Sequence, residues 1–61
     1  MKMYITNRFG DTVELTVKPG HKNGVECFDS TIEGVKIATS DTLENLRRES
    51  KIAIESLDIA N

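Results

Sequence analysis

The fold of this chain is decided by the stretch Thr39-Ser40-Asp41-Thr42-Leu43-Glu44-Asn45-Leu46, which continues without glycine or proline to about Ile59. Asp41 is a good N-cap for a helix, and Glu44, three residues later, completes a pair typical of a capping box. Thr39 and Ser40 are alternative caps. The sequence therefore predicts one helix from Thr42 to about Ile59, about 18 residues and about 27 Å long.

The predicted helix has two apolar sides. A stripe about 120° wide, at about 100° per residue, consists of Leu43, Leu46, Ser50, Ala53, Ile54, Leu57 and Ala60. We expect this stripe to pack on a sheet. The opposite side carries Ile52 and Ile59, flanked by Arg48, Glu55 and Asn45. Single exposed isoleucines are ordinary on protein surfaces, but this back face also suits packing against a second protomer or a partner protein.

Two segments near the N-terminus have the alternation of half-buried strands: Met1, Met3 and Ile5 in the first, and Val13, Leu15 and Val17 in the second. A two-residue turn would split these apolar rows between the two faces of a hairpin. A three-residue turn at residues 8–10 keeps them together, with Ile5 opposite Val13 and Gly10 in a left-handed conformation. Phe9 then lies at the hairpin tip, either folded back on its own hairpin or exposed as an anchor for a partner.

The middle of the chain predicts a second pair of strands. Residues 18–24 read as a loop, because Pro19-Gly20 and Asn23-Gly24 both favour turns. Strands are predicted at residues 25–29, where Val25 and Cys27 share the face away from Phe28, and at residues 34–39, with residues 30–33 as the link.

The predicted fold is one α+β domain over residues 1–61, an antiparallel four-stranded β-meander (β-β-β-β-α) with one C-terminal helix packed on one face.

The small size of the chain limits its core. A chain of 61 residues buries only about 60% of its unfolded surface. Cys27 is the single cysteine, so no internal disulfide can form, and its thiol fits a reducing compartment such as the cytoplasm. No segment has the roughly 20 apolar residues of a membrane span. A homodimer is the simplest remaining source of stability.

The titratable residues show no catalytic or metal-ligating spacing, so the sequence predicts a protein that is not an enzyme and has no cofactor or metal. An alternative function is a small-ligand sponge or an enzyme with its site at a dimer interface. This site would use Cys27, His21 or Tyr4. A second alternative is a nucleic-acid-binding regulator that uses the basic cluster of Arg47, Arg48 and Lys51. The net charge of −2 argues against nucleic-acid binding by bulk charge.

One segment has a recognisable order of residues: Phe28 and Asp29 end a strand, Gly34 opens the next, and Asp41-Thr42-Leu43-Glu44 opens the helix. In this order, residues 25–46 resemble the core of the HicB-type antitoxins. The chain lacks the family's proline between Phe28 and Asp29, and its link to Gly34 is longer. Ser40 replaces a glycine, and Asn45 stands where the family has an acid. The resemblance implies a non-catalytic module that pairs as a dimer and sequesters a small toxin protein, and it carries over no active-site residue.

These features favour a small non-enzymatic module that binds and inhibits or regulates a partner protein. The partner is expected to be a toxin or a host protein, as for an antitoxin or a phage-encoded inhibitor with an anti-defence role. The module is expected to act as a homodimer, without a membrane or a nucleic acid as partner. The residues expected at the partner or dimer interface are Phe9, Arg48, Ile52, Glu55 and Ile59.

Overall fold

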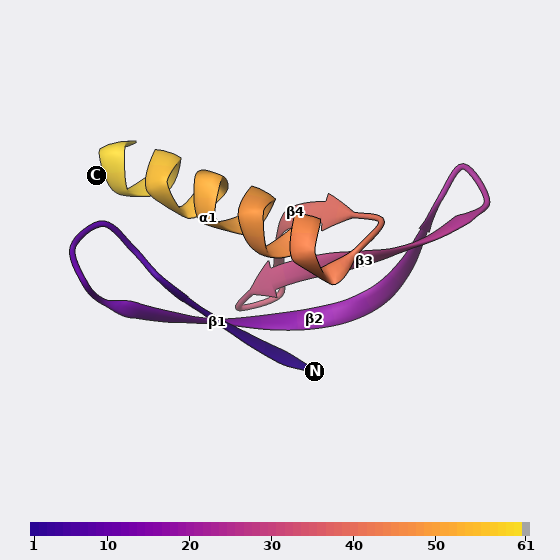
Figure 1. The fold of residues 1–61 in the computed structure, drawn as a ribbon, viewed down its shortest axis with the longest axis horizontal. Coiled ribbons are helices and arrows are strands. Elements are labelled where there is room, and N and C mark those ends of the chain that lie inside the picture. Colours follow the sequence, from indigo (N-terminus) through magenta and orange to yellow (C-terminus); the bar gives the residue numbers. More distant parts are fainter. Residues whose placement is uncertain (61) are drawn as a thin grey trace.

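The chain forms one antiparallel sheet covered on one face by one helix. The computed structural model describes the backbone of residues 1–60 and the side chains of residues 1–56. Its elements are β1 (Lys2–Thr6), β2 (Thr12–Lys22), β3 (Val25–Ile32), β4 (Val35–Ser40) and α1 (Leu43–Ala60). The strands lie in the order β1-β2-β3-β4, and α1 follows one face of the sheet (Figure 1). The predicted α+β meander with a C-terminal helix is confirmed.

The first hairpin has the predicted register. Ile5 pairs with Val13 and Met3 with Leu15. At the turn, the Gly10 amide donates to the Asn7 carbonyl at 3.1 Å, and the Asn7 amide donates to the Asp11 carbonyl at 2.9 Å. Gly10 has a φ of +86°, which a glycine adopts without steric strain. The three-residue turn at residues 8–10 is therefore confirmed.

The predicted loop at residues 18–24 is wrong, because β2 continues through Pro19 to Lys22. The Val17 amide donates to the Met1 carbonyl at 2.7 Å, so it points toward β1. The nitrogen of Pro19, two residues further on, points to the same side. At this position β2 extends past the N-terminal end of β1, so β1 offers no backbone partner. Proline therefore loses no hydrogen bond in this strand. The actual turn is the two-residue pair Asn23-Gly24, with φ of +53° and +78°.

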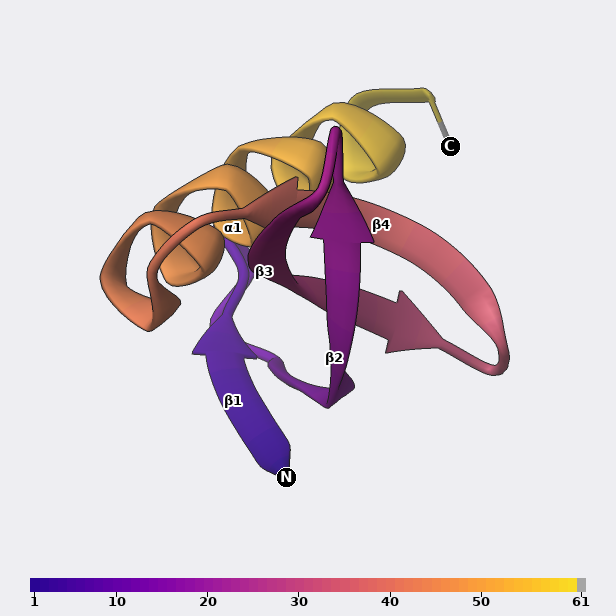
Figure 2. The same cartoon turned by 90° about the vertical axis from the view of Figure 1, so that its right-hand side faces the viewer.

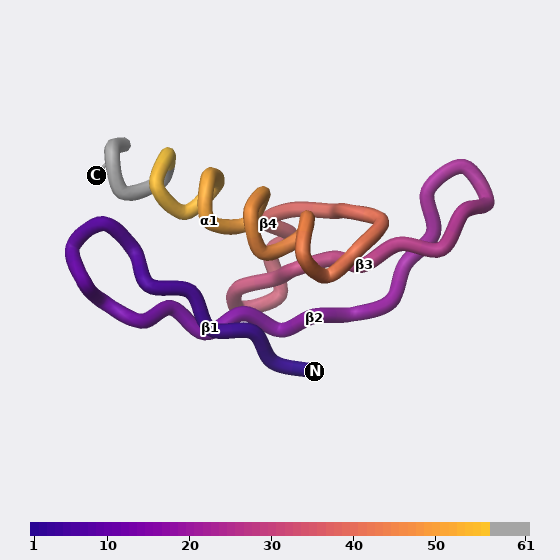
Figure 3. The backbone as a smooth tube through the Cα atoms, viewed as in Figure 1, coloured from indigo at the N-terminus to yellow at the C-terminus, as the bar shows by residue number. Residues whose placement is uncertain are grey.

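The predicted link at residues 30–33 is also wrong. β3 continues to Ile32, and Glu33-Gly34 forms the turn with φ of +50° and +82°. Ser30 pairs with Ala38 but Thr31 pairs with Lys36, so Ile37 is an extra residue that forms a bulge in β4. The β2–β3 hairpin, with its turn at Asn23-Gly24, projects well beyond the helix, as the backbone trace shows (Figure 3).

The start of α1 differs by one residue from the predicted cap. The Asn45 amide donates to the Thr42 hydroxyl at 3.1 Å, so Thr42 is the N-cap and Leu43 the first helical residue. Asp41 instead accepts from the Asn45 side-chain amide at 3.2 Å. Its carboxylate lies next to the positive end of the helix dipole without capping it.

The turned view shows α1 lying against one face of the sheet (Figure 2), and the core lies between the two. Its buried apolar side chains are Met3, Ile5, Leu15, Val17, Leu46 and Ile54. Leu15 and Leu46 are fully buried. Phe28 packs against this cluster, whereas Val25 is exposed and Cys27 is buried outside it. The predicted helix stripe is confirmed at Leu46, Ser50 and Ile54. Leu43 is 39% exposed, Ala53 is half-buried, and the side chains of Leu57 and Ala60 lie outside the described residues.

A polar contact lies inside this helix–sheet interface. The hydroxyls of Ser30 on β3 and Ser50 on α1 are 2.7 Å apart, and both side chains are fully buried. One hydroxyl donates to the other, so both take part in a hydrogen bond where water has no access. Two small side chains also let the helix and the strand approach closely. This contact explains why the polar segment at Ser30 is part of a strand instead of a loop.

We expect Ser30→Ala or Ser50→Ala alone to lower the free energy of unfolding by about 1–3 kcal/mol, because each leaves one buried hydroxyl without its partner. The double variant Ser30→Ala/Ser50→Ala should lose clearly less than the sum of the two single losses. Urea unfolding of the four proteins measures this coupling. Strictly additive losses would show that the two hydroxyls do not interact.

Candidate functional site

The residues predicted at the interface lie on two different elements. Phe9 is at the tip of the β1–β2 hairpin, whereas Arg48, Ile52 and Glu55 lie on α1. On the helix, Ile52 is one turn from both Arg48 and Glu55, so these three side chains form one continuous surface. The side chain of Ile59 lies outside the described residues.

Phe9 is held on a rigid turn. The Asn7 side-chain oxygen accepts from the amides of Phe9 and Asp11, each at 2.9 Å, in addition to the two backbone hydrogen bonds of the same turn. The Phe9 side chain is 63% exposed. The Arg8 guanidinium lies over its ring, 4.9 Å from the centroid, in a cation–π contact. The turn therefore presents an aromatic ring and a guanidinium together to the solvent.

The back face of α1 is confirmed as an exposed surface at Ile52. This side chain is 53% exposed, while Glu55 is half-buried. Arg48 donates from Nη2 to the Asn45 side-chain oxygen at 3.0 Å, which holds its guanidinium along the helix. The surface around Ile52 is therefore apolar at its centre and charged on both sides.

Two shallow hollows flank α1, one on each side. On the β1 side, the hollow is lined by Met1, Lys2, Met3, Leu43, Glu44 and Arg47. On the β4 side, it is lined by Val35, Lys36, Ile37, Ala53 and Ser56. The sequence could not reveal either hollow, because each depends on how far the helix covers the neighbouring strand.

The basic cluster on α1 is partly used within the fold. Arg47 donates from Nη1 to the Tyr4 carbonyl at 2.9 Å. This carbonyl points away from β2, because the backbone groups of Met1 that pair with Val17 point toward β2 and the direction alternates along the strand. Arg47 therefore covers an open position on the edge of β1. With Arg48 held by Asn45, only Lys51 of this cluster has no hydrogen bond or ion pair among the described side chains.

Cys27, His21 and Tyr4 do not converge on one site. His21 pairs with Glu26, whereas Cys27 pairs with Gly20, so His21 and Cys27 point to opposite faces of the β2–β3 hairpin. Tyr4 shares the face of Cys27, but it pairs with Glu14, six residues before Gly20 on β2. That separation is about 20 Å along the strand. Cys27 is buried in a hollow at the base of the hairpin, beside Thr39 and Asp41.

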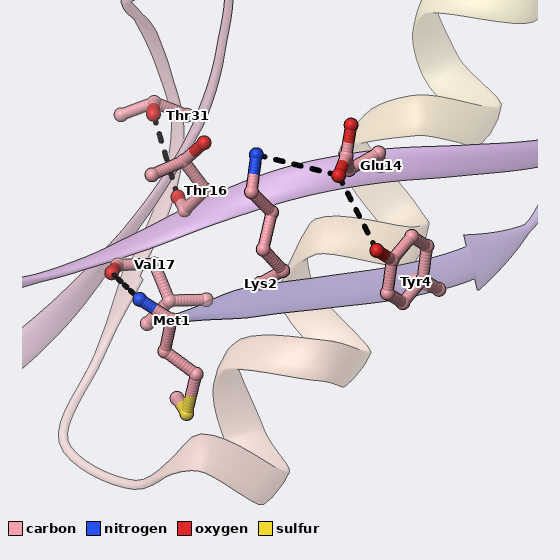
Figure 4. Close-up of polar contacts among 7 residues, drawn as sticks. All are labelled: Met1, Lys2, Tyr4, Glu14, Thr16, Val17 and Thr31. Carbon is pink, nitrogen blue, oxygen red and sulfur yellow. Dashed lines mark hydrogen bonds and ion pairs between the residues drawn. The ribbon is translucent and has the colours of Figure 1, made fainter.

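On the outer face of the sheet, the polar and charged side chains near β1 are paired with one another. Glu14 accepts from the Tyr4 hydroxyl and from the Lys2 ammonium, each at 3.3 Å (Figure 4). Thr31 on β3 donates to the Thr16 carbonyl at 3.3 Å. The two contacts of Glu14 lie in solvent and contribute little stability, whereas that of Thr31 is partly buried. They do keep the ring of Tyr4 close to the strand.

Comparisons with known proteins do not assign the chain to a family. The chain matches no protein-family model, no curated protein and no solved structure. The resemblance of residues 25–46 to the HicB-type antitoxins therefore stays a prediction. Within the described residues, His, Cys, Asp and Glu side chains do not gather in groups of three that could hold a metal ion. Over its described length, α1 is not apolar enough to cross a membrane.

We expect Asn7→Ala to loosen the hairpin tip, because it removes the oxygen that accepts from the amides of Phe9 and Asp11. The free energy of unfolding should fall by about 1 kcal/mol. Amide hydrogen exchange at Phe9 and Asp11 should accelerate more than at Met3 and Leu15 in the same hairpin. Unchanged exchange at the tip would contradict the assigned role of Asn7.

Proposed function

We propose that this protein is a small non-enzymatic interaction module that binds and inhibits or regulates a partner protein. The observation that carries the proposal is the exposed pair of Phe9 and Arg8 on a hydrogen-bonded turn. Aromatic residues and arginine are enriched among the residues that contribute most to protein–protein binding. A rigid turn also lowers the entropy lost when these side chains are fixed in a complex.

The chemistry of the hairpin tip defines the partner's surface. Phe9 requires an apolar pocket large enough for a phenyl ring. Arg8 requires an acidic group or a carbonyl at the rim of that pocket, since its guanidinium lies over the same ring. The partner is therefore a protein with an apolar pocket and an acidic rim. A nucleic acid could offer Arg8 a phosphate and Phe9 a base to stack on, but the net charge of −2 opposes its binding.

The biological setting of the proposal follows from the sequence. The resemblance to the HicB-type antitoxins implies a toxin as the partner, while a phage-encoded inhibitor would bind a host defence protein. In either case the protein acts in the cytoplasm as a homodimer, without a cofactor. The free thiol of Cys27 fits that reducing compartment.

We expect tagged wild-type protein to retain one partner protein from the cells of its native host in a stoichiometric amount. Phe9→Ala should lose this partner. With the partner purified, calorimetric titration should show an affinity at least about 30-fold weaker, which corresponds to the roughly 2 kcal/mol of a dominant interface residue.

Val25→Ala is the matched control for this experiment. Val25 is 62% exposed on the other projecting hairpin, so its truncation removes exposed apolar surface, smaller than that of a phenyl ring, from a different place. This variant should bind the partner with wild-type affinity. A partner that binds Phe9→Ala as tightly as wild type would overturn the assignment of the hairpin tip.

A further inference from the structure

We propose that the β4 side of α1 is the surface through which two copies of this chain form the homodimer of the proposed function. The hollow on this side has a volume of about 390 Å³ and is lined by Val35, Lys36, Ile37, Ala53 and Ser56. Val35 is 63% exposed, and Ile37 is only half-buried. Two apolar side chains of β4 are thus left partly uncovered beside the helix.

An apolar projection lies near this hollow. Ile52 is one turn before Ser56, which lines the hollow, and its side chain is 53% exposed. A projection and a hollow on one surface are self-complementary under two-fold symmetry. The Ile52 side chain of each copy can enter the hollow of the other, as a symmetric dimer interface requires.

The charges around Ile52 and around the hollow are complementary as well. Lys36 lines the hollow, and among the described side chains it forms no ion pair. Ile52 has Glu49 on the side of the hollow, since Glu49 is one turn before Ala53, and Arg48 and Glu55 on its other side. In the proposed dimer, the Glu49 carboxylate beside Ile52 lies near the partner's Lys36. The symmetry repeats this contact, so opposite charges meet twice.

The edge of β4 is protected against a different mode of pairing. A second copy could add its own strand to an unprotected sheet edge. Here Ile37 forms a bulge that interrupts the regular spacing of backbone groups, and Lys36 places a charge at the same edge. Lysine and bulges are common means of preventing strand addition. The β4 side therefore favours the packing of side chains over backbone pairing.

The expected affinity is moderate. The chain exposes 4338 Å² in total, and a stable interface commonly covers about 800 Å² on each partner. One side of one helix with one strand provides less than that. We therefore expect a dissociation constant in the micromolar range, which fits an equilibrium between monomer and dimer.

Sedimentation velocity over about 5–500 μM tests this dimer, since that range spans micromolar dissociation constants. We expect wild type to shift from monomer to dimer as its concentration rises. Ile52→Glu should weaken the dimer at least tenfold. Val25→Glu introduces the same charge at a similarly exposed valine of the β2–β3 hairpin, and it should dimerise like wild type.

A charge exchange provides an independent variant that keeps the core intact. Lys36→Glu should weaken the dimer, because it places like charges together. Adding Glu49→Lys and Glu55→Lys to Lys36→Glu should restore it. Circular dichroism melts at low concentration check that each variant folds. A dimer that neither Ile52→Glu nor Lys36→Glu weakens would refute this surface while leaving the homodimer intact.

Two further results separate this inference from the proposed function. A wild type that stays monomeric at every concentration would overturn the homodimer but not the binding of a partner by Phe9. A monomeric wild type whose Ile52→Glu variant loses the protein partner would assign the β4 side of α1 to that partner. Either result would refute the dimer.

Discussion

One helix has to cover the inner face of four strands, although the helix is narrower than the sheet. Most features of this protein follow from this difference in width. An α-helix with its side chains is about 10 Å wide, while the outer strands of a four-stranded sheet are about 14 Å apart. The helix buries the centre of the sheet at Leu15 and also covers Met3 and Ile5 on β1, so the flank that it leaves partly open is β4. Ile37 and Ala38 on β4 accordingly pack against the core without being fully buried, as do Val13, Phe28 and Ile32 on the two inner strands.

The centre of the interface also determines where the helix lies. Leu46 fills the core one turn before Ser50, whose hydroxyl contacts Ser30 on β3. A buried hydroxyl pair adds little net stability, but each partner is costly to leave alone. It therefore disfavours a helix shifted along its axis, in which both hydroxyls would lose their partner. Arg47 reinforces the same position from the β1 side through the Tyr4 carbonyl.

The sequence predicted the structural features that depend on residues close to one another along the chain. The helix, the three-residue turn and the pairing of Ile5 with Val13 all follow from local spacing, and the exposure of Ile52 follows from helical periodicity. The position of Pro19 within β2 was missed, because proline is tolerated there only where β1 has already ended.

Features that depend on packing between distant segments were also missed. Ser30 looks like a loop residue until Ser50 is placed opposite it. The hollow beside Ile52 requires both the bulge in β4 and the path of α1 above it. Phe9 was correctly placed at the hairpin tip, but the contact of its ring with Arg8 depends on the conformation of the turn.

The flank left open by the narrow helix on the β4 side is the surface that we propose receives a second copy of the chain. Amide ¹H–¹⁵N spectra recorded across a dilution series of uniformly ¹⁵N-labelled wild type test it residue by residue. Concentration-dependent shifts should be confined to residues 35–37 and 49–56, with residues 7–11 at the hairpin tip unchanged. Spectra that do not depend on concentration, or shifts centred on Lys2, Met3 and Leu43 at the opposite flank, would contradict it.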